Sequence, residues 1–195
     1  MAKASIRIYG DPVLRTNAEQ IRQLDAEVHD LVARMVAAMC ENEGVGLAAP
    51  QVGSPSRVIV ARPDAEEGAE IFRLINPRII AADGSQEGME GCLSLPSLRG
   101  EVERSAQVAV EAMTPEGKNI TIEATGLLAR VLEHEIDHLS SVLFVDRAAA
   151  DTLCWLIPDP DAEEGYRLED TTIEEAEQRF ARLRAKRQAK GGAQQ

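Results

Sequence analysis

Aromatic residues, pairable cysteines and long apolar runs are scarce in this sequence of 195 residues. One Trp, two Tyr and three Phe leave aliphatic side chains to fill the core. No stretch approaches the roughly 20 apolar residues of a membrane-spanning helix, and the N-terminus lacks the apolar run of a signal peptide. Cys40, Cys92 and Cys154 form an odd count without close pairing, which favours a reducing compartment over a disulfide framework. We therefore expect a cytoplasmic protein.

The charge is also one-sided, because acidic residues exceed basic ones. The formal net charge is −12 and the isoelectric point is about 4.8. This balance argues against general binding to DNA or to an anionic membrane. The hydrophobic content of 44% is ordinary for a soluble protein and is sufficient for a core in a chain of this length.

The periodicity of apolar residues predicts an α+β fold. Apolar side chains three and four residues apart predict a helix over residues 25–42, and a second helix over 126–139 is apolar nearly all round, so it should be buried. Alternating apolar residues predict a single strand from 102 to 112. We expect largely antiparallel β-sheets packed around the central helix, with one further helix near each terminus. The other expected strands cover residues 57–61, 71–76 and 120–124.

The end of the chain differs in character from the rest. We expect a main domain over residues 1–147 and a C-terminal extension over 148–195. A short helix is predicted over 148–157, followed by an acidic linker from Pro158. A capping-box pattern, Thr172-x-x-Glu175, predicts a last helix over residues 173–190.

The buried helix carries the sequence HEIDH, with His134 and His138 four residues apart. This spacing places both imidazoles on one side of a helix, where they can bind one metal ion. Glu135 lies beside that ion as a candidate general base. The third ligand is better supplied by the thiolate of Cys92 than by a downstream His or carboxylate. Three protein ligands leave a fourth position for water, as in catalytic sites.

Three motifs in order identify a resemblance. The sequences GVGLAAPQ (44–51), EGCLS (90–94) and HEIDH (134–138) match G-x-G-x-A-A-x-Q, E-G-C-x-S and H-E-x-D-H. Over about residues 6–147 the chain resembles peptide deformylase, the hydrolase that removes the formyl group from the N-terminal formyl-methionine of new bacterial and organellar proteins. The resemblance implies that N-formyl-methionyl peptides are the substrates.

The resemblance also implies a metal and a catalytic base. Cys92, His134 and His138 would hold one divalent ion, with Fe2+ expected and Zn2+, Ni2+ or Co2+ as alternatives. Donor chemistry alone leaves zinc, iron and nickel open. Glu135 would act as general acid and base. The other thiols, Cys40 and Cys154, are expected to be small buried core residues.

Other site residues follow from the same resemblance. The side-chain amide of Gln51 and the backbone N–H of Leu93 would stabilise the oxyanion. Arg99 would contact the substrate backbone, although a surface arginine without a role remains an alternative. Four residues are expected to line a pocket for the methionine side chain, and core packing would explain them almost as well. The expected substrate-binding residues are Gly44, Val45, Gly46, Met89, Arg99, Leu127 and Val131.

Polar neighbours should hold the metal ligands in place. The resemblance assigns Glu90 and Arg104 to an ion pair that supports the cysteine loop. Asp137 is expected either to orient an imidazole or to pair with a nearby arginine. One departure from the family is Ser140-Ser141, where a glycine commonly precedes the Leu-Phe pair, and it concerns the end of the helix rather than a ligand.

Two other functions are open at this point. A zincin-type endopeptidase would need a distal Glu or His ligand, and no suitable motif is present in the sequence. A catalytically silent paralogue that serves as a binding module would not need every motif position to be filled.

The last predicted helix is basic, with six cations and no acid from Arg179 to Lys190. Family members bring a C-terminal helix to the ribosome, and a basic helix suits ribosomal RNA. Alternatively, these cations and the glutamates near the helix start complement the helix dipole. The apolar stripe is narrow and predicts light docking on the domain; it consists of Ile173, Ala176, Phe180 and Leu183.

Overall fold

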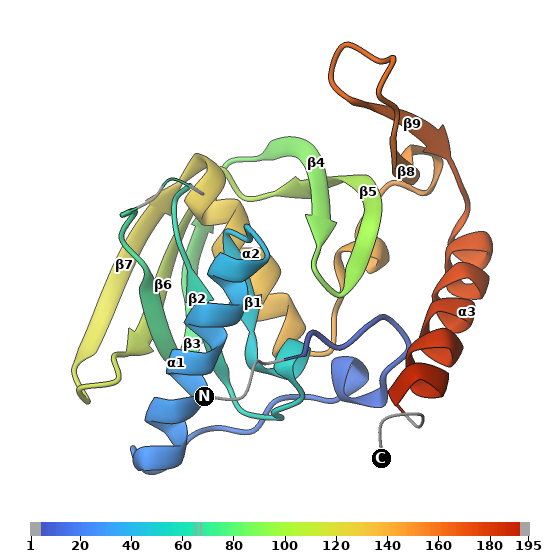
Figure 1. Cartoon of the computed structure of the whole chain (residues 1–195). Coiled ribbons are helices and arrows are strands. Elements are labelled where there is room, and N and C mark those ends of the chain that lie inside the picture. Colours follow the sequence, from blue (N-terminus) through green and yellow to red (C-terminus); the bar gives the residue numbers. More distant parts are fainter. Residues whose placement is uncertain (1–4, 65, 67, 192–195) are drawn as a thin grey trace.

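Two antiparallel sheets and three α-helices make up the computed structural model, which describes residues 5–64, 66 and 68–191 (Figure 1). The five-stranded sheet, in the order β1-β2-β3-β6-β7, contains β1 (Gly46–Ala48), β2 (Val58–Ala61), β3 (Phe72–Asp83), β6 (Gln107–Met113) and β7 (Asn119–Thr125). The four-stranded sheet, in the order β4-β5-β8-β9, contains β4 (Gln86–Cys92), β5 (Leu95–Arg104), β8 (Cys154–Pro158) and β9 (Tyr166–Asp170). The helices are α1 (Ala26–Glu41), α2 (Gly126–His138) and α3 (Ile173–Gly191).

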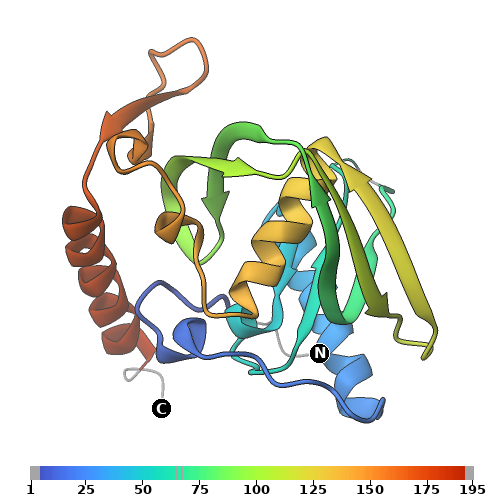
Figure 2. The same cartoon turned by 180° about the vertical axis from the view of Figure 1, so that it is seen from behind.

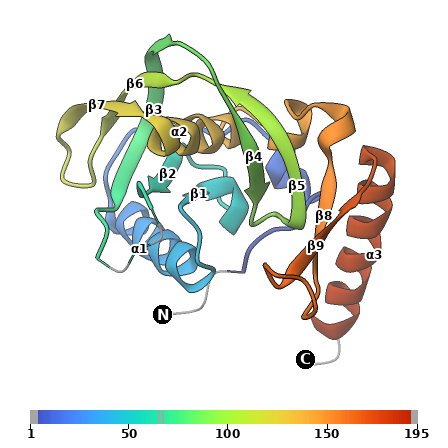
Figure 3. The ribbon, with the colours of Figure 1, turned by 90° about the horizontal axis from the view of Figure 1, so that it is seen from above.

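The larger sheet lies between two helices. Val58 and Val60 of β2 belong to the core that α1 covers, whereas Ile59 and Ala61 belong to the core that α2 covers. Successive residues of a strand point to opposite faces, so a strand that is buried on both faces must be apolar throughout. Figure 3 shows α1 and α2 on opposite sides of β1 and β2. The predicted α+β fold around a central helix is confirmed.

The smaller sheet forms a second core together with α3. Phe180 is 1% exposed, and its ring centroid lies 5.5 Å from that of Trp155 on β8. Ala176 is also buried in this cluster. The narrow stripe therefore docks α3 through two buried residues, one of which is a large aromatic side chain. The predicted capping box is confirmed, with reciprocal hydrogen bonds of 3.3 Å between Thr172 and Glu175.

Two predicted elements differ from those observed. The single strand expected over 102–112 is divided, because β5 ends at Arg104 and β6 begins at Gln107 in the other sheet. The Glu133 carboxylate accepts hydrogen bonds from both the backbone N–H and the hydroxyl of Ser105, which holds this corner. The short helix expected over 148–157 is a 3₁₀ turn followed by β8, because β5 offers backbone partners to this segment.

The segment after Pro158 and the side chain of Cys40 also differ from what the sequence predicts. The acidic linker expected after Pro158 is the turn of a hairpin, since β8 and β9 pair from Cys154↔Asp170 to Pro158↔Tyr166. Cys40 is exposed rather than buried, whereas Cys154 is buried as expected.

The remaining predicted helices and strands are confirmed within one or two residues at most ends; β3 extends beyond the predicted 71–76 to Asp83. Within the described ranges, none of the helices has both the length and the apolar composition that crossing a membrane requires. The division of the chain at residue 147 stays a prediction.

Candidate metal centre

Three buried side chains converge between α2 and the end of β4. The ligand atoms of Cys92, His134 and His138 all lie within 4.8 Å of one another. Cys92 Sγ is 3.3 Å from His138 Nε2. One thiol and two imidazoles are donors that suit zinc, iron or nickel. The arrangement therefore fits a single metal ion.

The electrostatic surroundings also favour a cation here. Burial opposes a charge on His134, yet hydrogen bonds to Cys92 and Glu90 and the charge of Glu135 raise its pKa well above the usual value. Burial and the neighbouring His134 lower the pKa of His138, which keeps that imidazole neutral, the form that binds metals. The site thus combines a neutral ligand with anionic surroundings.

Glu90 orients His134 by accepting a hydrogen bond of 2.9 Å from its Nδ1 atom, which leaves Nε2 for a metal. Asp137 does not serve this purpose. Its carboxylate pairs with the guanidinium groups of Arg104 and Arg147, as the arginine alternative predicted. His138 Nδ1 is buried without a partner among the described residues.

Glu90 is the centre of a buried ion network. Its carboxylate binds Arg104 through two hydrogen bonds of 2.9 and 3.0 Å, so the predicted ion pair is confirmed. Burial would raise the pKa of Glu90, but hydrogen bonds to His134 and Arg104 hold it far below its ordinary value. Glu90 is thus an anion that holds the cysteine strand against α2.

Arg130 also belongs to this network, although the sequence reasoning missed it. Its Nη1 atom donates to Glu90 at 2.7 Å and to the carbonyl of Val102 at 2.9 Å. Its Nη2 atom donates to the carbonyl of Gln86. The feature of the sequence that could have identified Arg130 is its position on an otherwise apolar helix. A charge on a buried helix needs buried partners.

Glu135 points its carboxylate into the same space and is 4% exposed. Its Oε2 atom has no hydrogen-bond partner among the described residues. Burial raises its pKa to about 7. The carboxylate packs against the backbone of Gly46, where any Cβ atom would overlap it. The glycine of the first motif therefore makes room for the acid of the third.

Gln51 joins the first motif to the cysteine. Its side-chain oxygen accepts from the backbone N–H of Ala48 at 2.7 Å, and its Nε2 atom donates to Cys92 Sγ at 3.3 Å. The backbone bond fixes which end of the amide faces the thiol. Leu93 follows Cys92 directly and lines the same cavity.

A cavity of about 590 Å³ opens beside these groups. Val131 is buried in its wall, whereas Met89 and Leu127 stand about half exposed at its rim. Arg99 lies across β4 in the space left by Gly91. Every residue expected in the site lines this cavity except the deeper His138. Besides Arg130, lining residues that the sequence reasoning did not identify are Ile6, Ile8, Asn42, Glu43, Pro96, Ser97 and Arg187.

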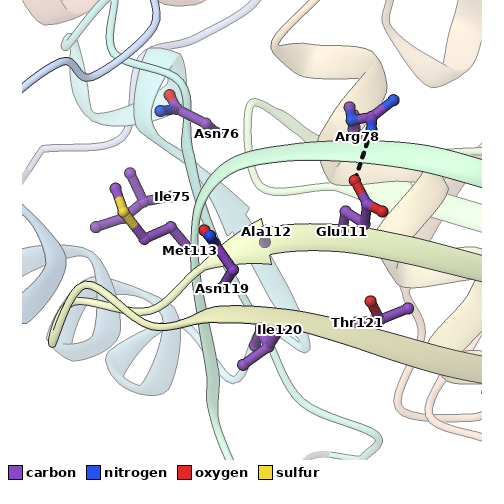
Figure 4. Close-up of a pocket in the computed structure, with 9 residues that line it drawn as sticks. All are labelled: Ile75, Asn76, Arg78, Glu111, Ala112, Met113, Asn119, Ile120 and Thr121. Carbon is purple, nitrogen blue, oxygen red and sulfur yellow. Dashed lines mark hydrogen bonds and ion pairs between the residues drawn. The ribbon is translucent and has the colours of Figure 1, made fainter.

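A separate cavity of about 470 Å³ lies beside β3, β6 and β7 (Figure 4). The amide of Asn76 is occupied by hydrogen bonds of 2.9 and 2.8 Å to the backbone of Ile21. Arg78 and Glu111 pair with each other at 2.6 Å. Asn76, Arg78 and Glu111 thus already have partners, and the lining residues that the structure describes include no Cys or His, so this cavity is not the candidate site.

The helix that carries both histidines lies at the centre of the molecule, as Figure 2 shows from behind.

The sequence profile of the polypeptide deformylase family matches residues 3–152. A peptide deformylase of Alkaliphilus metalliredigens is 50% identical over 147 residues, which cover 75% of this chain and 97% of that protein. One of Natranaerobius thermophilus is 47% identical over 149 residues, covering 76% of this chain and 94% of the relative.

Solved structures agree with these relatives. The crystal structure of peptide deformylase from Thermotoga maritima superposes with a TM-score of 0.72 at 38% identity, covering 76% of this chain and 99% of that one. A plant peptide deformylase, PDF1B, superposes with a TM-score of 0.78 at 30% identity, covering 98% and 95%. With three motifs meeting in one buried site, this chain belongs to the polypeptide deformylase family.

Proposed function

We propose that this enzyme removes the N-formyl group from formyl-methionine at the N-terminus of newly made polypeptides, in the cytoplasm. The observation that carries the proposal is the convergence of Cys92, His134 and His138 with the Glu135 carboxylate on one cavity. The cytoplasm is supported by three free thiols.

The proposed reaction is hydrolysis of the formyl amide. A divalent ion, when bound by Cys92, His134 and His138, supplies Lewis acidity that lowers the pKa of water toward ~7. Glu135 takes the proton of the attacking water and later gives it to the leaving amine. A carboxylate whose pKa is close to neutrality is suited to both transfers.

Neutral donors stabilise the tetrahedral intermediate. Gln51 Nε2 is held toward the thiol by the bond of its other end to Ala48. We propose that this amide and the backbone N–H of Leu93 donate to the oxyanion. Because both groups are uncharged and already fixed in place, little reorganisation is needed during the reaction.

The cavity supplies recognition. Val45, Met89, Leu127 and Val131 form the proposed pocket for the methionine side chain, and Arg99 contacts the substrate backbone. Gly44 and Gly46 line the same cavity, and we propose that their backbone lies against the substrate chain.

The metal is proposed to be Fe2+, with Zn2+, Ni2+ or Co2+ able to occupy the same donors. We would purify the protein anaerobically, measure its metal content, and assay formyl-Met-Ala-Ser, acetyl-Met-Ala-Ser and an internal peptide on that sample. Hydrolysis of the formyl peptide alone is expected. Cleavage of the internal peptide would indicate an endopeptidase, and metal binding without any hydrolysis would indicate a silent paralogue.

Contact with the ribosome through α3 is a further part of the proposal. Three of its cations are engaged within the protein: Arg179 lies 4.0 Å from the centre of the Trp155 ring, and Arg184 and Arg187 donate to backbone carbonyls of the N-terminal segment. Arg182 and Lys186 are exposed and remain for RNA.

Point variants test this contact better than truncation does, because removal of α3 would expose the core around Phe180. Arg182→Glu with Lys186→Glu should weaken ribosome binding and reduce the slope of log K against log salt by about 2. Hydrolysis of formyl-Met-Ala-Ser should be unchanged. Arg22→Glu with Arg73→Glu changes the net charge equally elsewhere and is the control. Equal effects of the two pairs would leave only the helix-dipole explanation.

A further inference from the structure

The smaller sheet has one covered face and one open face. Leu98 and Trp155 pair across β5 and β8 and lie in the core beneath α3. Because side chains alternate along a strand, the next residues, Arg99 and Leu156, belong to the opposite face. Leu156 pairs directly with Leu168 of β9, so that face carries two neighbouring leucines.

This open face is hollowed next to the metal cavity. A groove of about 410 Å³ is lined by Met89, Arg99, Leu156, Glu164, Tyr166 and Leu168. Met89 and Arg99 line the metal cavity as well, so the two spaces adjoin at these side chains. Leu168 is 54% exposed and Met89 is 47% exposed. Large apolar side chains that are grouped and half exposed commonly mark a binding surface.

Four of the six residues that line the groove belong to a part of the chain that the family profile does not cover. The match ends at residue 152, and β8 and β9 span residues 154–158 and 166–170. Figure 3 shows this hairpin beside β5, as an extension of the sheet that begins with β4. The apolar wall formed by Leu156 and Leu168 therefore lies outside the range of the family profile, next to the metal cavity at Met89 and Arg99.

We propose that the open face of β8 and β9 is a subsite for the substrate's own chain, which takes apolar side chains at its fourth and fifth residues. This inference rests on the proposed function. Neighbouring strands lie about 4.8 Å apart, so β8 and β9 are roughly 10–14 Å from β4. An extended chain spans roughly 3.3 Å per residue, so three or four residues cover that distance.

Anchoring explains why the substrate is the occupant. Once the formyl-methionine lies in the cavity, the following residues are held close to Met89 and Arg99, which raises their effective concentration at the groove. An apolar contact in the groove then costs no further translational or rotational entropy, because the substrate is already bound. Glu164 stands at the edge of the groove and disfavours an acidic residue at the same positions.

The test compares three peptides on the metal-loaded enzyme: formyl-Met-Ala-Ser, formyl-Met-Ala-Ser-Leu-Leu and formyl-Met-Ala-Ser-Ser-Ser. We expect kcat/KM of the Leu-Leu peptide to exceed that of the Ser-Ser peptide by roughly five- to tenfold, since partial burial of a leucine has about this effect. Leu168→Ser should reduce the ratio to about 1–2 while the tripeptide is hydrolysed normally. Ile80→Ser removes a similarly exposed side chain from the other sheet and should preserve the ratio.

Each outcome decides the question. Equal rates for the two pentapeptides on the unchanged enzyme, or a ratio that Leu168→Ser leaves intact, overturns the subsite while the proposed function stands. No turnover of the tripeptide by the unchanged enzyme rejects the proposed function and the subsite with it. The tripeptide rate of Leu168→Ser also reports whether this variant is folded, and Leu168→Thr is the milder second variant.

Discussion

The buried carboxylate of Glu135 makes a quantitative prediction for the metal-free protein. Below pH 4.5 the group is protonated in both the folded and the unfolded chain. Between pH 4.5 and about 7 the unfolded chain releases the proton while the folded chain keeps it, so folding stability falls as pH rises. Each pKa unit corresponds to about 1.4 kcal/mol, so the rise from 4.5 to about 7 destabilises the folded state by about 3 kcal/mol above pH 7.

Glu135→Gln removes this titration and keeps the size of the side chain. The difference in the free energy of unfolding, variant minus unchanged protein, is expected to increase by about 3 kcal/mol as the pH rises from 4.5 to 7. Urea denaturation of both chelator-treated proteins at several pH values measures the difference. Titrating groups away from Glu135 are common to both proteins and largely cancel, whereas the pKa of His134 is lower in the variant because the charge of Glu135 is lost. A difference in unfolding free energy that stays constant from pH 5 to pH 8 would refute the reasoning.

Metal loading provides the control for this prediction. A divalent cation near Glu135 favours its charged form, so Ni2+ should reduce the pH dependence of the difference. The same variant should retain its metal and lose roughly 10²–10⁴-fold in turnover, because the amide cannot accept a proton. Turnover within a few-fold of the unchanged enzyme would place the base elsewhere.

Three further predictions concern the metal ligand Cys92, the glycines of the first motif and the sensitivity of the metal to oxygen. Cys92→Ser should lose metal and activity together, because a neutral hydroxyl replaces a thiolate, whereas Cys154→Ser should keep both in metal analysis and assay. Gly46→Ala should displace the Glu135 carboxylate and reduce kcat far more than Gly44→Ala, whose added methyl has its shortest contact, 3.1 Å, with the flexible end of Leu93. In aerated buffer the Fe2+ enzyme should lose activity by oxidation while the Ni2+ enzyme persists; equal decay would contradict metal-centred damage.

Elements with local signals could be predicted from the sequence. The spacing of His134 and His138 predicts a shared ligand face, because the α-helical repeat is a property of the backbone. The same holds for the apolar stripe of α1 and for the capping box of Thr172 and Glu175, which span only a few residues. Joining Cys92 to the histidines needed the additional information of a motif resemblance.

Features whose partners are distant in the chain could be seen only in the folded structure. Arg130 of α2 binds Glu90 of β4. Glu133 of α2 accepts a hydrogen bond from Ser105 at the corner between β5 and β6, where the alternation of apolar residues predicts one continuous strand. β8 is a strand because the backbone of β5 lies beside it, although its own residues also suit a helix. α3 is anchored because Phe180 meets Trp155 in a core that no single segment contains. Backbone pairing and burial depend on which segments meet, and local periodicity carries no information about that.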